Sequence, residues 1–98
     1  MTSKQRAYLK GIAMVTDPCL NIGKDGIEGS VTDAVLEAID KRELVKLNVL
    51  KNCMEDIQEL ARVLSERTHS EVVQVIGRRI VLYKPAKKKE DRRIVLPK

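Results

Sequence analysis

The stretch CLNIGKDGIEGSVTDAVLEAIDKRELVKLNVL, residues 19–50, decides the fold of this 98-residue chain. It opens with a short apolar run, Cys19–Ile22. This run lies between Pro18 and Gly23, which is typical of a buried strand. Apolar residues then recur at helical spacing: Val31, Val35, Ala38 and Ile39. Next, Leu44–Leu50 alternates between apolar and polar residues, which predicts a strand with one face open to solvent or ligand. Strand–helix–strand order of this kind predicts a βαβ unit.

A helix is expected before this unit and another after it. Thr2-Ser3-Lys4-Gln5 matches the capping box, in which a threonine oxygen accepts the amide three residues on and the glutamine reaches back. This first helix should end at Asp17-Pro18, because a proline disfavours helical backbone at the residue before it. The later helix has the clearest apolar stripe of the chain, Ile57, Leu60, Ala61 and Leu64, and should end near Thr68.

The start of the middle helix stays ambiguous in the sequence. Ser30-x-x-Asp33 is a capping pattern, which would start the helix after Ser30. Alternatively, Glu28 begins the helix, which places Gly29 inside it at a cost of about 1 kcal/mol.

Two strands are expected near the C-terminus. The runs Val72–Ile76 and Arg79–Tyr83 are rich in β-branched residues and are separated only by Gly77-Arg78, which predicts a hairpin. Either Gly77 has the positive φ that this turn needs, or the loop is longer. The whole pattern, αβαβαββ, predicts one compact α/β domain over residues 1–84, in which three helices pack on a four-stranded mixed sheet. Residues 85–98 form a basic tail, which is either a disordered solubilising end or a contributor to anion binding.

Charge is unevenly distributed along the chain. The net charge is +5, yet residues 77–98 hold nine basic and two acidic residues, and the middle of the chain is acidic. Such asymmetry indicates an anionic partner, either a lipid surface or a nucleic acid. Tyr8 and Tyr83 are the only aromatic residues. RRM and OB modules stack bases on aromatic side chains, so their mode of binding is excluded.

Other classes of protein are not expected. No apolar run approaches the roughly 20 residues of a membrane span, and no apolar segment of a secretory signal follows the basic N-terminus. Cys19 and Cys53 lack a CxxC partner and His69 is the only histidine, so we expect no metal, no cofactor and a reduced, cytoplasmic protein. The acidic residues of the middle helix recur as on a solvated face, and nothing indicates a catalytic centre or a small-molecule substrate.

The loop Gly23-Lys24-Asp25-Gly26 is the most informative motif. Two glycines let backbone amides approach a phosphate, and the lysine and the following helix add positive charge. The spacing is not that of a P-loop or a dinucleotide fingerprint, and an ordinary βα turn explains it equally well. Cations that could extend an anion site lie elsewhere in the chain: Lys4, Arg6, Lys10, Lys46, Arg78 and Arg79.

Several motifs together closely resemble the bacterial YhbY proteins, which are stand-alone CRM domains (chloroplast RNA splicing and ribosome maturation). They are Thr2-Ser3-Lys4-Gln5-Arg6 with Leu9-Lys10-Gly11, Ile22-Gly23-Lys24-x-Gly26-Ile27, Glu43-Leu44-Val45-Lys46, Val73-Gln74-Val75-Ile76-Gly77, Val81-Leu82-Tyr83-Lys84 and Ile94-Val95-Leu96-Pro97. The resemblance covers essentially the whole chain. Two positions depart from the family pattern: Asp25 replaces a small or uncharged residue, and Glu28 stands where a threonine or asparagine cap is common.

The resemblance implies a fold similar to the C-terminal domain of translation initiation factor three. It also implies RNA binding and association with precursors of the large ribosomal subunit, with the loop of residues 23–26 and its basic surroundings as the site. We therefore expect a monomeric, non-enzymatic protein whose partner is ribosomal RNA or a pre-large-subunit particle. The alternative is a protein-interaction module that docks on a ribosomal protein or assembly factor, pairing Ile94–Leu96 with a sheet edge of its partner.

Overall fold

The computed structural model describes residues 1–28 and 30–97. Its helices and strands follow the predicted order αβαβαββ, and two short 3-10 turns, η1 and η2, lie between or after them. The elements are α1 (Ser3–Met14), β1 (Leu20–Ile22), η1 (Gly26–Glu28), α2 (Val31–Arg42), β2 (Leu44–Val49), α3 (Ile57–Thr68), β3 (Glu71–Ile76), β4 (Arg79–Tyr83) and η2 (Lys89–Asp91).

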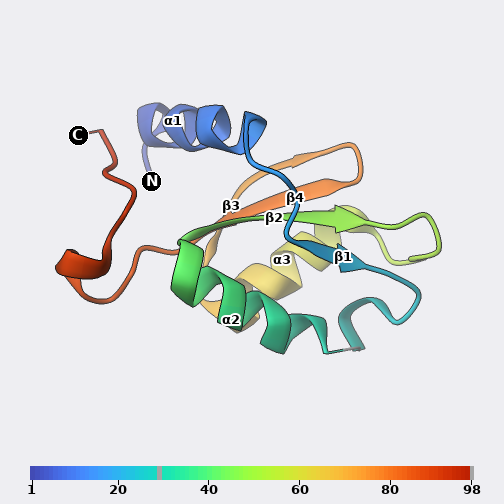
Figure 1. Ribbon diagram of the computed structural model, residues 1–98. Helices are drawn as coiled ribbons and strands as arrows, with labels where there is room; N and C mark the ends of the chain where they lie inside the picture. The colour runs from blue at the N-terminus through green and yellow to red at the C-terminus, as the bar shows by residue number, and fades with distance from the viewer. Residues whose placement is uncertain (29, 98) are drawn as a thin grey trace.

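The four strands form one mixed sheet in the order β1-β2-β4-β3. β1 is parallel to β2, with α2 as the crossover between them, and the other two pairs are antiparallel. Figure 1 shows α2 and α3 against one face of the sheet and α1 across part of the other face. The predicted α/β fold with a βαβ unit is confirmed.

Local sequence signals account for most element boundaries. The Thr2–Gln5 capping box is complete: Gln5 N donates to Thr2 Oγ1 at 3.1 Å, and Thr2 N donates to Gln5 Oε1 at 3.1 Å. Asp56 caps α3 by accepting a hydrogen bond from Glu59 N. Gly77 has a φ of +57°, so the first of the two hairpin alternatives is confirmed.

The predicted start of α2 after Ser30 is confirmed, but the predicted side-chain cap is not found. α2 begins at Val31, but the Ser30 side chain makes no cap hydrogen bond. Its backbone, with φ −80° and ψ 17°, is not in the extended conformation typical of a capping residue. Glu28 belongs to η1 instead of α2, so the second alternative is wrong. Gly29 lies outside the described residues.

Two apolar clusters fill the two sides of the sheet. The larger one joins the sheet to α2 and α3; its fully buried members include Val35, Ile39, Leu47, Leu60, Leu64, Ile80 and Leu82. The smaller one lies under α1: Leu9, Ala13, Leu44, Val73, Val81 and Tyr83. Consecutive residues of β4 alternate between the clusters, as strand geometry requires. Odd-numbered β4 residues therefore face the α1 side.

The C-terminal tail is attached to the domain through a buried acid, Glu43, which is 1% exposed. Its carboxylate accepts hydrogen bonds from the tail amides Ala86 N (3.1 Å), Arg93 N (2.5 Å) and Ile94 N (3.2 Å). Glu43 also has a φ of +64°, in the region that non-glycine residues rarely adopt. Burial, with the charge of Glu43 as a second cause, raises the pKa of the Tyr83 phenol.

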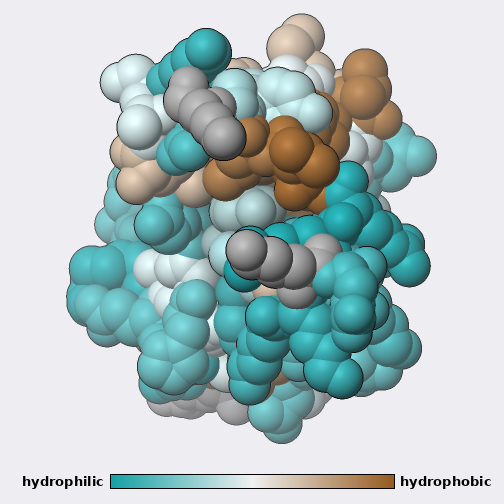
Figure 2. Space-filling view, turned by 90° about the vertical axis from the view of Figure 1, so that its left-hand side faces the viewer, coloured by the Kyte–Doolittle hydropathy of each residue, from teal (hydrophilic) through white to brown (hydrophobic). Residues whose placement is uncertain are grey.

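Beyond this anchor, the tail packs on α1. Ile94 and Leu96 pack against the smaller apolar cluster, and Gln5 Nε2 donates to Pro97 O at 3.1 Å. Figure 2 views this side of the molecule, with hydrophobic residues gathered in its upper part and hydrophilic residues over most of the rest. Ile94 and Leu96 therefore already have partners within the chain.

Candidate nucleic-acid interface

Three loops meet at one end of the sheet: residues 23–26 after β1, residues 50–56 after β2 and the β3–β4 turn. Leu50 N donates to Ile22 O at 2.8 Å, which joins the first two loops. The Arg78 guanidinium donates to Val49 O at 2.9 Å and to Leu50 O at 2.5 Å, which joins the third. The carboxyl ends of the parallel strands β1 and β2 lie here, where open α/β sheets commonly bind ligands.

Gly26 has a structural reason to be glycine, and Gly23 has none of the same kind. Gly26 N donates to Gly23 O at 3.0 Å, and Gly26 has a φ of +54°. A Cβ atom on Gly26 would lie 1.9 Å from Glu55 Oε1, whereas the nearest atoms to a Cβ on Gly23 are 3.6 Å away.

The carboxylate of Glu55 lies where it competes with an incoming anion. It accepts a hydrogen bond from Ile27 N at 2.9 Å, at the start of η1. Within residues 1–28 and 30–97, the amides of Lys24 and Asp25 donate to no protein acceptor. The loop thus offers two backbone donors and the exposed ammonium of Lys24 to an anion, beside the exposed carboxylate of Asp25.

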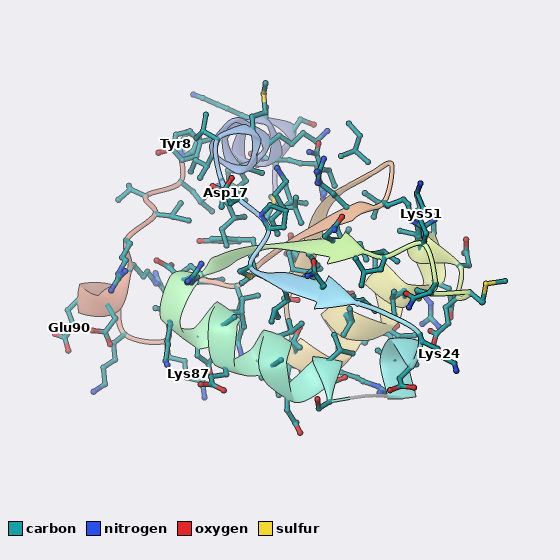
Figure 3. All side chains as sticks on the ribbon, turned by 45° about the vertical axis from the view of Figure 1, so that its right-hand side comes forward. Tyr8, Asp17, Lys24, Lys51, Lys87 and Glu90 are labelled. Carbon is teal, nitrogen blue, oxygen red and sulfur yellow. The ribbon has the colours of Figure 1, made fainter. Side chains whose placement is uncertain are left out.

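Lys51 also lies at this end of the sheet, although it is not among the site residues predicted from the sequence. Lys24 and Lys51 are each two residues past the end of a strand, and those strand ends, Ile22 and Val49, are register partners. Figure 3 shows both lysines at the same end of the molecule. The equal spacing after two parallel strands is the signal that would have found Lys51.

The other predicted site residues divide into two groups. Arg78 and Arg79 are at the loop end, with Gly23–Gly26. Lys4 and Lys10 are exposed on α1, on the sheet face opposite α2 (Figure 1). The fold therefore does not gather the cations of α1 and the loop at one edge.

Like Arg78, two further predicted contacts, Arg6 and Lys46, make hydrogen bonds within the domain. One guanidinium nitrogen of Arg6 donates to Val72 O (2.5 Å) and Val73 O (3.0 Å), which ties α1 to β3. The Lys46 ammonium donates to Ala13 O (3.0 Å), in the last turn of α1, and to Thr16 O (3.2 Å), just beyond that helix. A lysine in this position stabilises a helix C-terminus.

Residues 1–28 and 30–97 also bear on membrane spans, metal sites and free thiols. None of their helices is both long and apolar enough to cross a membrane. No group of three or more His, Cys, Asp and Glu side chains among these residues could hold a metal ion. Cys19 and Cys53 are free thiols, and His69 is the exposed C-cap of α3, with a φ of +54°.

Comparison with known proteins identifies the family. The model of the CRS1/YhbY (CRM) domain matches residues 1–84. The chain belongs to the CRM domain family. A Bacillus subtilis relative, named "Probable RNA-binding protein YqeI", is 39% identical over 97 residues, which are 99% of each chain. A Haemophilus influenzae relative named "RNA-binding protein" is 31% identical over 98 residues, covering 100% of this chain and 96% of the relative.

A solved structure extends the comparison to three dimensions. The solution structure of SAV1595 from Staphylococcus aureus, described as a candidate RNA-binding protein, matches with a TM-score of 0.81. The two chains are 43% identical, and the match covers 99% of each. The CRM fold described above is thus shared with a protein studied in solution.

Proposed function

We propose that this protein binds RNA through the loop end of its sheet, and that it does so without catalysing a reaction. In this proposal residues 1–84 form the RNA-binding domain and the tail stabilises it. The named relatives support RNA as the partner, since two curated relatives carry that activity in their names. The resemblance to the YhbY proteins supports precursors of the large ribosomal subunit as the particle, assistance in their assembly as the role, and the cytoplasm as the place.

The observation that carries the proposal is the charge at the loop end. Lys24, Lys51, Arg78 and Arg79 project from the ends of four strands, and all are exposed. Two of the nearby carboxylates, Glu55 and Asp56, already accept hydrogen bonds from backbone amides. Cations so placed would neutralise phosphates, and the open amides of residues 24 and 25 would add hydrogen bonds to phosphate oxygens. Backbone and shape contacts are the mode open to a domain with two aromatic residues.

The docking alternative has weaker support. It needs Ile94–Leu96 to be free to pair with the sheet edge of a partner. Two of these three residues pack against α1 within the chain, and the carbonyl of the next residue, Pro97, accepts a hydrogen bond from Gln5.

A salt titration of RNA binding tests the proposed site. Each phosphate contact adds about 0.7–0.9 to the slope of log K against log salt concentration, so the double variant Lys24→Ala/Lys51→Ala should lower the slope by about 1.5. Binding is measured by fluorescence anisotropy on a structured ribosomal RNA fragment at several salt concentrations.

Lys46→Met is the matched control. It also removes a lysine charge, but that lysine contacts the end of α1, so it should leave the slope unchanged and lower the melting temperature. Equal slopes in the wild type and the double variant would place the RNA elsewhere on the protein.

A further inference from the structure

A row of side chains crosses the sheet where α1 does not cover it. The row follows the strand register: Asn21 pairs with Asn48, Asn48 with Arg79, and Arg79 with Ile76. It faces the α1 side, because Arg79 shares the side of β4 on which Val81 and Tyr83 pack under α1. Asn21, Arg79 and Ile76 are exposed, and Asn48 is half-buried.

The row lies between the cations of α1 and the loop-end lysines Lys24 and Lys51. Along β2, Lys46 contacts the end of α1, Asn48 follows on the same face, and Lys51 stands in the loop beyond. Figure 1 shows the same arrangement, with α1 over one half of the sheet and the loop ends beyond the other half. An RNA strand held by the loop cations and running towards α1 would pass over the row.

The chemistry of the row suits the edges of bases more than it suits phosphates. Asn48 Nδ2 donates to Asn21 Oδ1 at 3.4 Å, which orients the two amides side by side. In the described part of the chain, Asn48 Oδ1, Asn21 Nδ2 and the Arg79 guanidinium have no other protein partner. They present one acceptor and several donors in planar groups, which is the pattern that pairs with base edges.

Asparagine is an unusual choice for a sheet surface, where it is depleted relative to β-branched and aromatic residues. The row contains no carboxylate that would repel RNA. Arg79 can also stack its guanidinium plane on a base, which supplies part of what aromatic residues provide in other modules.

We propose that Asn21, Asn48 and Arg79 bind the bases of unpaired RNA. The inference rests on the proposed RNA binding and adds to it a preference for single-stranded nucleotides over duplex. In duplex RNA the base edges are paired, and the major groove is too narrow for side chains to enter. Unpaired bases, in contrast, expose their edges.

The test compares two kinds of RNA probe with the full-length protein. The first kind is a set of 12-nucleotide single strands of different base composition. The second is a hairpin with the same number of phosphates and the shortest loop that closes, so that most of its bases are paired. We expect the wild type to bind at least one single strand more tightly than the hairpin. Asn21→Ala/Asn48→Ala should lose about fivefold or more in affinity for that strand, and should keep its salt slope and its affinity for the hairpin.

Two further variants sharpen the result. Arg79→Lys keeps the positive charge and removes the planar guanidinium. It should therefore reduce the difference in affinity between strands of different base composition and leave the salt slope unchanged. Gln58→Ala removes an exposed amide from α3, on the opposite face, and should change no affinity.

The outcomes separate this inference from the proposed function. No binding of the wild type to either probe would overturn both. Binding of every single strand no more tightly than the hairpin, or an unchanged affinity of the asparagine variant for the preferred strand, would overturn the inference alone. Equal weakening of both probes would also overturn it, since that result marks a general loss of binding.

Discussion

Replacement of Glu43 by alanine should lower the free energy of unfolding by about 2–4 kcal/mol and release the tail. The Glu43 carboxylate accepts three tail amides in a site that is almost fully buried. Without it, those amides either remain unsatisfied or move into water, taking Ile94 and Leu96 away from α1. Either outcome removes stability from a domain whose total is about 5–15 kcal/mol.

Urea unfolding and hydrogen exchange at residues 86, 93 and 94 measure the effect. Glu43→Gln keeps one acceptor oxygen and should lose less than the alanine variant. Glu37→Ala removes an exposed acid that pairs with Lys41 at 3.6 Å, and such a pair contributes at most about 1 kcal/mol. A loss below about 1 kcal/mol in Glu43→Ala, with unchanged exchange in the tail, would mean that the anchor is not needed.

The second large effect is expected at Gly26. An alanine there would have to hold a φ of +54°, and its Cβ would collide with the Glu55 carboxylate. The left-handed backbone and the loss of the Ile27 hydrogen bond together should destabilise the domain by about 2 kcal/mol.

Gly23→Ala is the matched control, because the nearest atoms to its new methyl group are at ordinary contact distance. Its free energy of unfolding should stay within about 0.5 kcal/mol of the wild type. Thermal melts of the two variants make the comparison, and similar melting temperatures would contradict the assigned role of Gly26.

Features that depend on nearby residues could be predicted from the sequence. The Thr2–Gln5 box, the α3 stripe and the turn glycine Gly77 each depend on contacts within a few residues, and all three are confirmed. Ser30 is the exception, because a capping pattern gives the residue types and cannot say whether the backbone of the capping residue is extended. The Ser30 backbone is not extended, and its side chain makes no cap hydrogen bond.

The sequence could not predict which charged side chains make hydrogen bonds within the domain, because those bonds join residues that are distant in the chain. From the sequence, Arg6 and Lys46 are interpreted as surface cations. In the structure they donate hydrogen bonds to carbonyls that are 66 and 33 residues away in the chain. Glu43 reads as part of a charged helix end and is buried. The asparagine row needs the strand register to be seen at all, since Asn21 and Asn48 are 27 residues apart.

The family resemblance supplied what physical reasoning from the sequence left open. Charge asymmetry allowed a lipid surface or a nucleic acid, and the loop alone allowed an ordinary turn. The match over residues 1–84 establishes the CRM domain, and the structure then shows which cations are exposed and which make hydrogen bonds within the fold.

Crosslinking of the bound protein to RNA tests the central claim most directly. After ultraviolet irradiation of the complex, the modified residues are mapped by mass spectrometry. We expect crosslinks in residues 21–26, 48–52 and 76–79, which form the loop end and the adjoining sheet face. Crosslinks confined to α2, α3 and the tail, with none in those three segments, would contradict the proposed site.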